Sequence, residues 1–351
     1  MTYNHSQEVY QDKYFTNSIV TAISLTAIST IAIGGNFLVL VSIGINRNLR
    51  SSSDLLLANL AVADLGQALL AIPFRVIEFL RADEHVTFLI PCHIVALIAI
   101  LFGGASNINI LLVSIDKFVA IMSPFKYNTR ATEKIFIASV VMSWAWLLVF
   151  AVLPLVGWGR AEYNVSSPTC RFTTTFSGDY LITSFILIHG IPLTTTIILY
   201  LFILKAALRH SRAIAAQEFC LRTNDARVNH RSLADEDTLT NSEQHAYYEN
   251  RNLPKRMRSR RPTRGARMIA VLVGVFILLN LPIVMIDLVE IWNGPTVPSA
   301  VVSVAVCLIC ANSAINFLIY GGWNREYKRT FRIIFACLWN FVKRPFSASR
   351  T

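Results

Sequence analysis

Charge is scarce in this sequence and is missing from most of its length. Only 15% of the 351 residues are Asp, Glu, Lys or Arg, whereas 54% are hydrophobic. A helix of about 20 apolar residues spans the ~30 Å hydrocarbon core of a membrane, and seven runs in the chain are long enough to do so. The runs are Ile19–Ile45, Leu55–Phe74, Phe88–Ile115, Ile135–Trp158, Tyr180–Leu204, Met268–Ile286 and Val297–Trp323.

These runs contain one formal charge among them, that of Asp64. Lipid offers no hydrogen-bond partner to the backbone, so segments of this kind cross a membrane as helices. The predicted fold is therefore an all-α membrane protein, a bundle of seven transmembrane helices.

The net charge of +11 reflects where the basic residues lie. Lys and Arg gather after the first, third, fifth and seventh runs, most densely in the stretch 209–267, while the alternate loops contain few. By the positive-inside rule, this bias places the N-terminus outside and the C-terminus in the cytoplasm. We therefore expect a multi-pass plasma-membrane protein and no nucleic-acid partner.

No cleavable signal peptide is visible in residues 1–17, which lack an apolar core. We expect the first helix to serve as its own insertion signal. Two glycosylation sequons, at Asn4 and Asn164, both fall on segments predicted to be outside. Their agreement with the charge bias favours glycosylation at both.

Cysteine is also rare, with six residues in the chain. Cys92 and Cys170 fall on the outer, oxidising side, which makes a disulfide between them the natural pairing. Cys337 follows a basic amphipathic stretch after the seventh run. This position suits reversible palmitoylation, although an unmodified thiol is an equal alternative.

The chain divides into three parts. Residues 1–17 form a short extracellular segment, 18–323 form the bundle with a third cytoplasmic loop at about 209–267, and 324–351 form an amphipathic helix and tail. Apolar side chains at helical spacing among Lys and Arg predict that helix. Because the outer segments are short, an extracellular ligand must enter the bundle or contact its rim.

Short motifs fall one or two to each predicted helix. They are Gly35-Asn36, Asn59–Asp64 (NLAVAD), Asp116-Lys117-Phe118, Trp144 with Pro154, Pro192 with Tyr200, Pro282, and Asn316–Tyr320 (NFLIY). In order and spacing they resemble the class A, rhodopsin-like G-protein-coupled receptors, from about residue 17 to 339. The resemblance implies a receptor rather than an enzyme, with a heterotrimeric G protein, membrane lipid and an extracellular ligand as partners. Arrestin and a second receptor are further partners that it suggests.

Asp64 is the most costly residue to bury in a membrane, which makes it a functional candidate. The resemblance places Asp64, Ser106, Asn312, Ser313 and Asn316 at the family's internal sodium site. All five offer oxygen to a hard cation. The alternative is a structural polar network around the carboxylate.

The resemblance also assigns coupling and switching residues. They are Asp116, Lys117, Phe118, Phe125, Tyr200, Phe276, Pro282, Asn316 and Tyr320. Lys117 departs from the family's arginine and lacks that side chain's planar fork of donors. Asn280 stands where the family has tryptophan, and Phe317 stands in place of a proline. Coupling with altered side chains and a non-signalling receptor are both compatible with these departures.

Two missing residues narrow the range of possible ligands. Opsins need a lysine at the position of Cys310, so we expect no retinal and no other cofactor. Amine receptors need an aspartate at the position of Ala99, which disfavours a conventional monoamine. The candidate pocket residues are Arg75, Ala99, His189, Asn280, Asp287 and Cys310.

Near the predicted outer mouth, Arg75 is one turn from Glu78 and is expected to pair with it. Asp287 and Glu290 are also one turn apart and could meet a cationic or hydrogen-bonding group. For Glu290, a solvated helix end is an equal alternative. A nucleoside, an amine-like molecule or a lipid fits better than a large protein. A transporter or channel remains as another class, although the sequence shows no inverted repeat.

Overall fold

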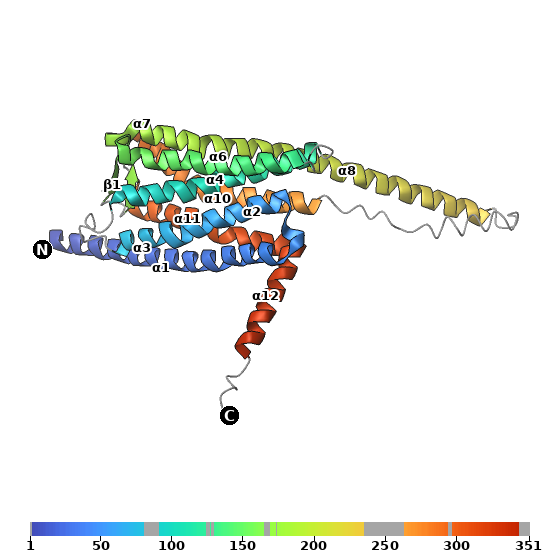
Figure 1. Cartoon of the computed structure of the whole chain (residues 1–351), viewed down its shortest axis with the longest axis horizontal. Coiled ribbons are helices and arrows are strands. Elements are labelled where there is room, and N and C mark those ends of the chain that lie inside the picture. The colour runs from blue at the N-terminus through green and yellow to red at the C-terminus, as the bar shows by residue number, and fades with distance from the viewer. Residues whose placement is uncertain are drawn as a thin grey trace, which may run out of the picture.

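The computed structural model describes residues 2–80, 91–123, 127, 130–164, 169–172, 174–234, 263–293 and 297–343. In this part of the chain, seven helical spans are long and apolar enough to cross a membrane, as predicted. They lie alongside one another in a bundle (Figure 1). The elements are α1 (Thr2–Ile45), η1 (Arg47–Leu49), α2 (Ser52–Gly66), η2 (Gln67–Ala71), α3 (Ile72–Leu80), α4 (Cys92–Met122), α6 (Arg130–Val152), η4 (Leu153–Val156), β1 (Ala161–Asn164), β2 (Thr169–Phe172), α7 (Thr174–Ser184), η5 (Phe185–Gly190), α8 (Ile191–Ala234), α10 (Thr263–Asn293), α11 (Ser299–Trp323) and α12 (Arg325–Lys343).

The segments outside the bundle refine the predicted boundaries. Residues 2–17 continue α1 as helix, and α8 and α10 extend into the predicted third loop from both sides. The hairpin β1–β2 and the N-terminus lie at one end of the bundle, whereas α12 leaves from the other end (Figure 1). This arrangement agrees with the separation of outer and inner loops that the charge bias predicts.

The predicted amphipathic helix is α12, which departs steeply from the bundle axis (Figure 1). Tyr327 is fully buried, and its ring lies 5.9 Å from that of Tyr320 and 6.0 Å from that of Phe331. Farther along the helix, Phe335 is 59% exposed. The start of α12 therefore packs on the bundle, and its later apolar residues are left for the membrane surface.

Two transmembrane helices contain a wide π-type segment, and each lies just before a proline. The segment η2 precedes Pro73, and η5 precedes Pro192. A proline within a helix lacks an N–H, and its ring clashes with the carbonyl four residues earlier. Widening the preceding turn relieves that clash. Residues of both wide segments line the cavity described below.

Buried amides connect the helices in the interior. Asn36 of α1 donates from Nδ2 to the carbonyl of Ser313 on α11, at 2.9 Å. Asn59 of α2 accepts a hydrogen bond from the indole of Trp144 at 2.9 Å and donates to Asn109 of α4. These interhelical bonds hold the neighbouring helices in register, because no water is available in the bilayer core to replace a broken hydrogen bond.

Close approach of α1 and α11 depends on Gly35. A Cβ at this position would lie 2.0 Å from the ring of Phe317, whereas a Cβ at Gly34 would meet nothing within 4 Å. Phe317 is the residue that replaces the expected proline. Its ring therefore occupies space that only a glycine on α1 leaves open.

We predict that Gly35→Ala lowers stability by roughly 1–3 kcal/mol, because overpacking forces a rigid ring to move. Gly34→Ala is the matched control and should have little effect. Thermal unfolding of the purified protein, followed by a thiol-reactive dye, measures both. Equal melting temperatures for the two variants would contradict this packing.

Candidate functional site

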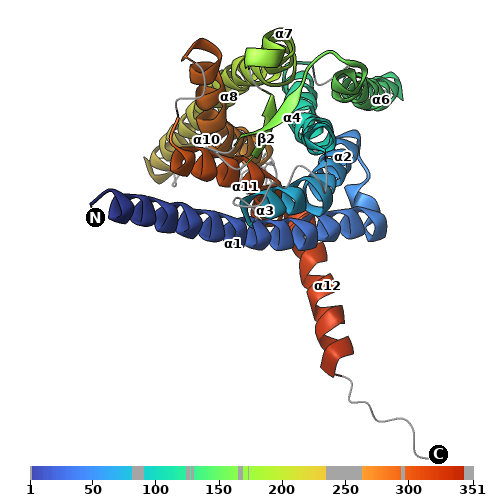
Figure 2. The ribbon, with the colours of Figure 1, turned by 90° about the vertical axis from the view of Figure 1, so that its left-hand side faces the viewer.

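An antiparallel hairpin crosses the end of the bundle at which the N-terminus lies (Figure 1). Strand β1 pairs with β2, with Tyr163 opposite Cys170. The predicted disulfide between Cys92 and Cys170 is present, with an S–S length of 1.99 Å. We call β2, residues 169–172, the strap, because it lies across the ring of helices when the bundle is viewed from this end (Figure 2).

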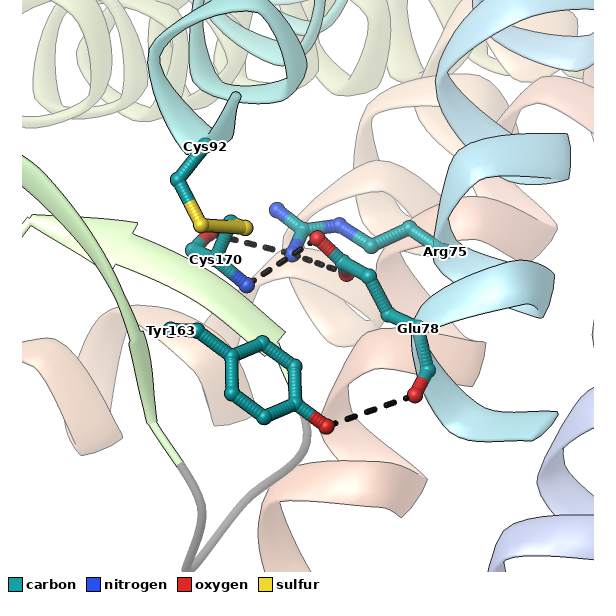
Figure 3. The surroundings of a disulfide bond; sticks show 5 residues. All are labelled: Arg75, Glu78, Cys92, Tyr163 and Cys170. Atoms are coloured by element: carbon teal, nitrogen blue, oxygen red, sulfur yellow. Dashed lines mark hydrogen bonds and ion pairs between the residues drawn. A yellow bond between two sulfur atoms is a disulfide. The ribbon is translucent and has the colours of Figure 1, made fainter. Parts of the chain in front are cut away.

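The first side of the strap is held by α3 as well as by the disulfide (Figure 3). Arg75 forms the predicted ion pair with Glu78 at 2.9 Å and also donates to the Cys170 carbonyl at 3.2 Å. Glu78 accepts a hydrogen bond from the Cys170 backbone N–H at 3.0 Å. The pair thus satisfies both backbone groups of one strap residue.

The second side of the strap is held by α10. The guanidinium of Arg171 lies 2.6 Å from Asp287 and 3.0 Å from Glu290. The sequence indicated that these two acids could receive a cationic group, and the chain itself supplies that group. Sequence reasoning missed Arg171. Its place beside Cys170 put it at this end of the bundle, but no local pattern indicated its partners on α10.

Beneath the strap lies a cavity of about 230 Å³. All six candidate pocket residues line it. On α4, Ala99, Gly103 and Asn107 follow one another at intervals of four residues and all face the cavity. At the cavity's inner end, Nδ2 of Asn107 lies 2.9 Å from Nδ1 of His189. The candidate residues are therefore brought together, and their contact with a ligand stays a prediction.

Asp64 is fully buried below this cavity. Its carboxylate accepts hydrogen bonds from Ser106 at 3.0 Å and from Nδ2 of Asn316 at 2.7 Å. Ser313 donates to Gln67 at 3.1 Å, and Asn312 lines the cavity. The oxygens of Asp64 and Ser106 suit a small hard cation, whereas Asn316 presents its nitrogen. Two of the four proposed partners, Ser106 and Asn316, therefore bond directly to the carboxylate of Asp64. The sodium site stays a prediction.

A second polar cluster lies near the C-terminal end of α4. Lys117 pairs with Asp116 at 2.9 Å and donates to Ser53 of α2. Asp116 also accepts from Ser53 at 2.6 Å and from Tyr127 at 2.5 Å. Burial, followed by the hydrogen bond to Asp116, raises the pKa of Tyr127 to about 12, so this hydroxyl remains a donor at neutral pH. Ser53 and Tyr127 were not singled out from the sequence.

The other switch residues surround this cluster or lie above it. Phe118 packs edge-on against Phe202 of α8, with the ring centroids 6.2 Å apart. Tyr200 and Phe276 belong to the apolar core beside it, and Pro282 lies within α10. The hydroxyl of Tyr320 is buried and has no hydrogen-bond partner in the described part of the chain. Phe125 lies outside the described residues.

The candidate modification sites are Cys337 for palmitoylation and Asn4 and Asn164 for glycosylation. Cys337 is an exposed free thiol on α12. Asn164 ends β1, but the rest of its sequon lies outside the described residues, as does the side chain of Asn4. Modification at all three positions stays a prediction.

The profile of the family described as "7 transmembrane receptor (rhodopsin family)" matches residues 35–320. The chain belongs to this family. The match covers every helix that contributes to the cavity, the Asp64 cluster and the Lys117 cluster. The resemblance carried by the sequence motifs is therefore confirmed.

Several of its relatives are receptors named for amines. It is 26% identical to octopamine receptor beta-2R of Drosophila melanogaster over 96% of this chain, and it spans 65% of that receptor's length. It is 26% identical to 5-hydroxytryptamine receptor 7 of Xenopus laevis over 95% of this chain and 80% of that receptor. It is 25% identical to the alpha-1A adrenergic receptor of Mus musculus over 90% of this chain and 67% of that receptor.

We predict that Arg171→Ala destabilises the receptor by roughly 1–3 kcal/mol, between the values typical of exposed and buried ion pairs. The loss leaves the like charges of Asp287 and Glu290 without their shared cation. Adding Asp287→Asn and Glu290→Gln should recover most of the melting temperature.

The control is Arg160→Ala beside the same hairpin, because Arg160 is 64% exposed in its pair with Glu162. That change should cost little. If both arginine variants melted at the parental temperature, the strap would not be held by ionic contacts.

Proposed function

We propose that this protein is a G-protein-coupled receptor that binds a small extracellular ligand beneath the strap and activates heterotrimeric G proteins. The supporting observation is a continuous chain of polar contacts from the cavity to the far end of α11. The cavity includes Ser106 and Asn312 at its inner end, and Ser106 donates directly to Asp64. Asp64 in turn accepts from Asn316, one turn of α11 above Tyr320. A ligand in the cavity can therefore bias the packing of helices that reach the cytoplasmic face.

In this proposal the strap faces outward, and Lys117 and α12 face the cytoplasm of a plasma-membrane receptor. The nucleotide exchange that the receptor promotes takes place on its G-protein partner, so the receptor itself performs no reaction. Arrestin, inner-leaflet lipid at α12 and a second receptor are further proposed partners.

The mouth of the cavity argues against a conventional monoamine. An ammonium group would need a carboxylate, yet Ala99 stands where amine receptors have aspartate. The described acids that line the cavity, Asp287 and Glu290, are already paired with Arg171. We therefore do not propose an amine ligand for this chain, although several relatives are named for amines. Retinal is also disfavoured, because Cys310 has no amine with which to form a Schiff base.

Sodium is proposed as an allosteric ion at Asp64, with Ser106 and an amide oxygen of Asn316 after rotation of its side chain. If this holds, the purified receptor should melt about 2–4 °C higher in sodium chloride than in choline chloride of equal ionic strength. Asp64→Asn should remove the difference, and Ser106→Ala should reduce it. A sodium effect that survives Asp64→Asn would assign the ion elsewhere.

Coupling is proposed to depend on Lys117. The side chain must leave Asp116 and Ser53 to reach a G protein, and its single ammonium group makes fewer directed bonds than an arginine fork. We predict measurable ligand-independent activity, increased by Lys117→Arg and reduced by Lys117→Ala. Ser53→Ala, which removes a contact on α2, should also increase it.

The measurement is a panel of G-protein dissociation sensors in transfected cells, normalised to surface expression. Lys134→Ala changes another cytoplasmic lysine that is exposed and serves as the control. Silence of the parent and of Lys117→Arg on every G protein would favour the non-signalling alternative.

A further inference from the structure

The charged groups at the mouth of the cavity are all engaged within the protein. Among the described residues that line the cavity, the formal charges belong to Arg75, Arg171, Asp287 and Glu290. Arg171 pairs with both acids, and Arg75 pairs with Glu78. A charged ligand would have to break one of these pairs away from bulk water, which is costly. The cavity is therefore better suited to a neutral molecule.

At the floor of the cavity, the hydrogen-bonding role of His189 is fixed by its neighbour Asn107. An amide Nδ2 can only donate, so Nδ1 of His189 accepts from Asn107 across 2.9 Å. The imidazole is then neutral and has its hydrogen on Nε2. His189 lines the cavity, and its Nε2 has no partner within the described protein and is not an enclosed atom. It offers one N–H donor to the cavity.

An acceptor is supplied by the neighbouring helix. Asn280 of α10 donates from Nδ2 to the carbonyl of Phe276 at 2.8 Å, which fixes the amide orientation. Its Oδ1 has no protein partner in the described part of the chain and is not among the enclosed unpaired atoms. Since Asn280 lines the cavity, this oxygen is the side-chain acceptor that it can offer to a ligand there. The residue that replaces the family's tryptophan thus supplies a hydrogen-bond acceptor.

Space for a flat group lies above these atoms. A Cβ at Gly103 would meet nothing within 4 Å, and Ala99 lies one turn farther out. The volume of about 230 Å³ is below the ~300–1,000 Å³ typical of pockets for drug-sized ligands. The cavity fits a molecule of about one ring with a short polar end.

From these contacts we propose that the receptor recognises a neutral ligand with an amide-like edge. The ligand's carbonyl accepts from Nε2–H of His189, and its N–H donates to Oδ1 of Asn280. Asn107 is a positioning residue, because it fixes the histidine tautomer. This inference rests on the proposed receptor function and specifies the ligand class of the same cavity.

The test uses three probes of equal shape, which are benzamide, the benzamidinium cation and the benzoate anion. Titrations by saturation-transfer NMR on the full chain in lipid nanodiscs give their dissociation constants. Benzamide should bind, and the two charged probes should bind at least about tenfold more weakly. N,N-dimethylbenzamide, which has lost its donor, should bind about threefold to tenfold more weakly than benzamide.

The variants His189→Phe and Asn280→Leu keep the bulk of each side chain and remove one hydrogen-bonding partner. Each should weaken benzamide by about threefold to tenfold. Gly103→Leu should abolish binding by filling the cavity, and Gly34→Ala, which lies where a Cβ meets nothing, should leave it unchanged. If Asn280→Leu does not fold, the comparison of benzamide with its dimethyl derivative on the parent still tests the contact between the ligand's N–H and Asn280. If His189→Phe does not fold, the comparison of benzamide with the benzamidinium cation, which has no carbonyl acceptor, tests the contact with His189.

Absence of benzamide binding, equal binding of a charged probe, or unchanged affinity in a folded floor variant would overturn the ligand class. Ligand-independent G-protein activation with any of these outcomes would leave the receptor function standing. Specific benzamide binding to a receptor that is silent on every G protein would support the ligand class and overturn the proposed signalling.

Discussion

A polar atom inside a membrane must find its partner within the protein, and this constraint determines how the bundle is arranged. Asp64 is fully buried and is held by donors from α4 and α11. Asn36 and Asn59 form similar links from α1 and α2. Because each bond joins different helices, the helices cannot rotate or slide independently without leaving a group unpaired. The same bonds place the cavity above one set of polar contacts and the Lys117 cluster below.

The sequence alone predicted those features whose signal lies within a short segment or follows from the side of the membrane. Apolar run length predicted the spans, oxidising location predicted Cys92–Cys170, and one-turn spacing predicted Arg75–Glu78. Arg171 was missed because its partner Asp287 is 116 residues away and nothing in either segment specifies how the strap crosses the bundle. The sequence indicated that the two acids could receive a cationic group, and in the structure Arg171 of the chain itself is that group.

The departures from the family motifs become intelligible once their neighbours are known. Phe317 fits because Gly35 lacks a side chain, so the position that usually bends α11 instead packs against α1. Asn280 opens onto a cavity whose floor also contains His189. Lys117 keeps its charge pairing with Asp116 and gains a contact to α2. The sequence alone shows that the family's usual side chains are missing at these positions. The contacts that compensate for them depend on three-dimensional packing and could not be predicted from it.

The central claim is that helices linked by buried polar bonds connect an outward cavity to a G-protein surface. The most direct measurement is the rate of GDP release from purified heterotrimers mixed with this receptor in lipid nanodiscs, compared with empty nanodiscs. The account predicts faster release from at least one class of Gα subunit, even without ligand, because Lys117 is held by a partly exposed pair rather than enclosed. Release at the empty-nanodisc rate from every class would contradict it.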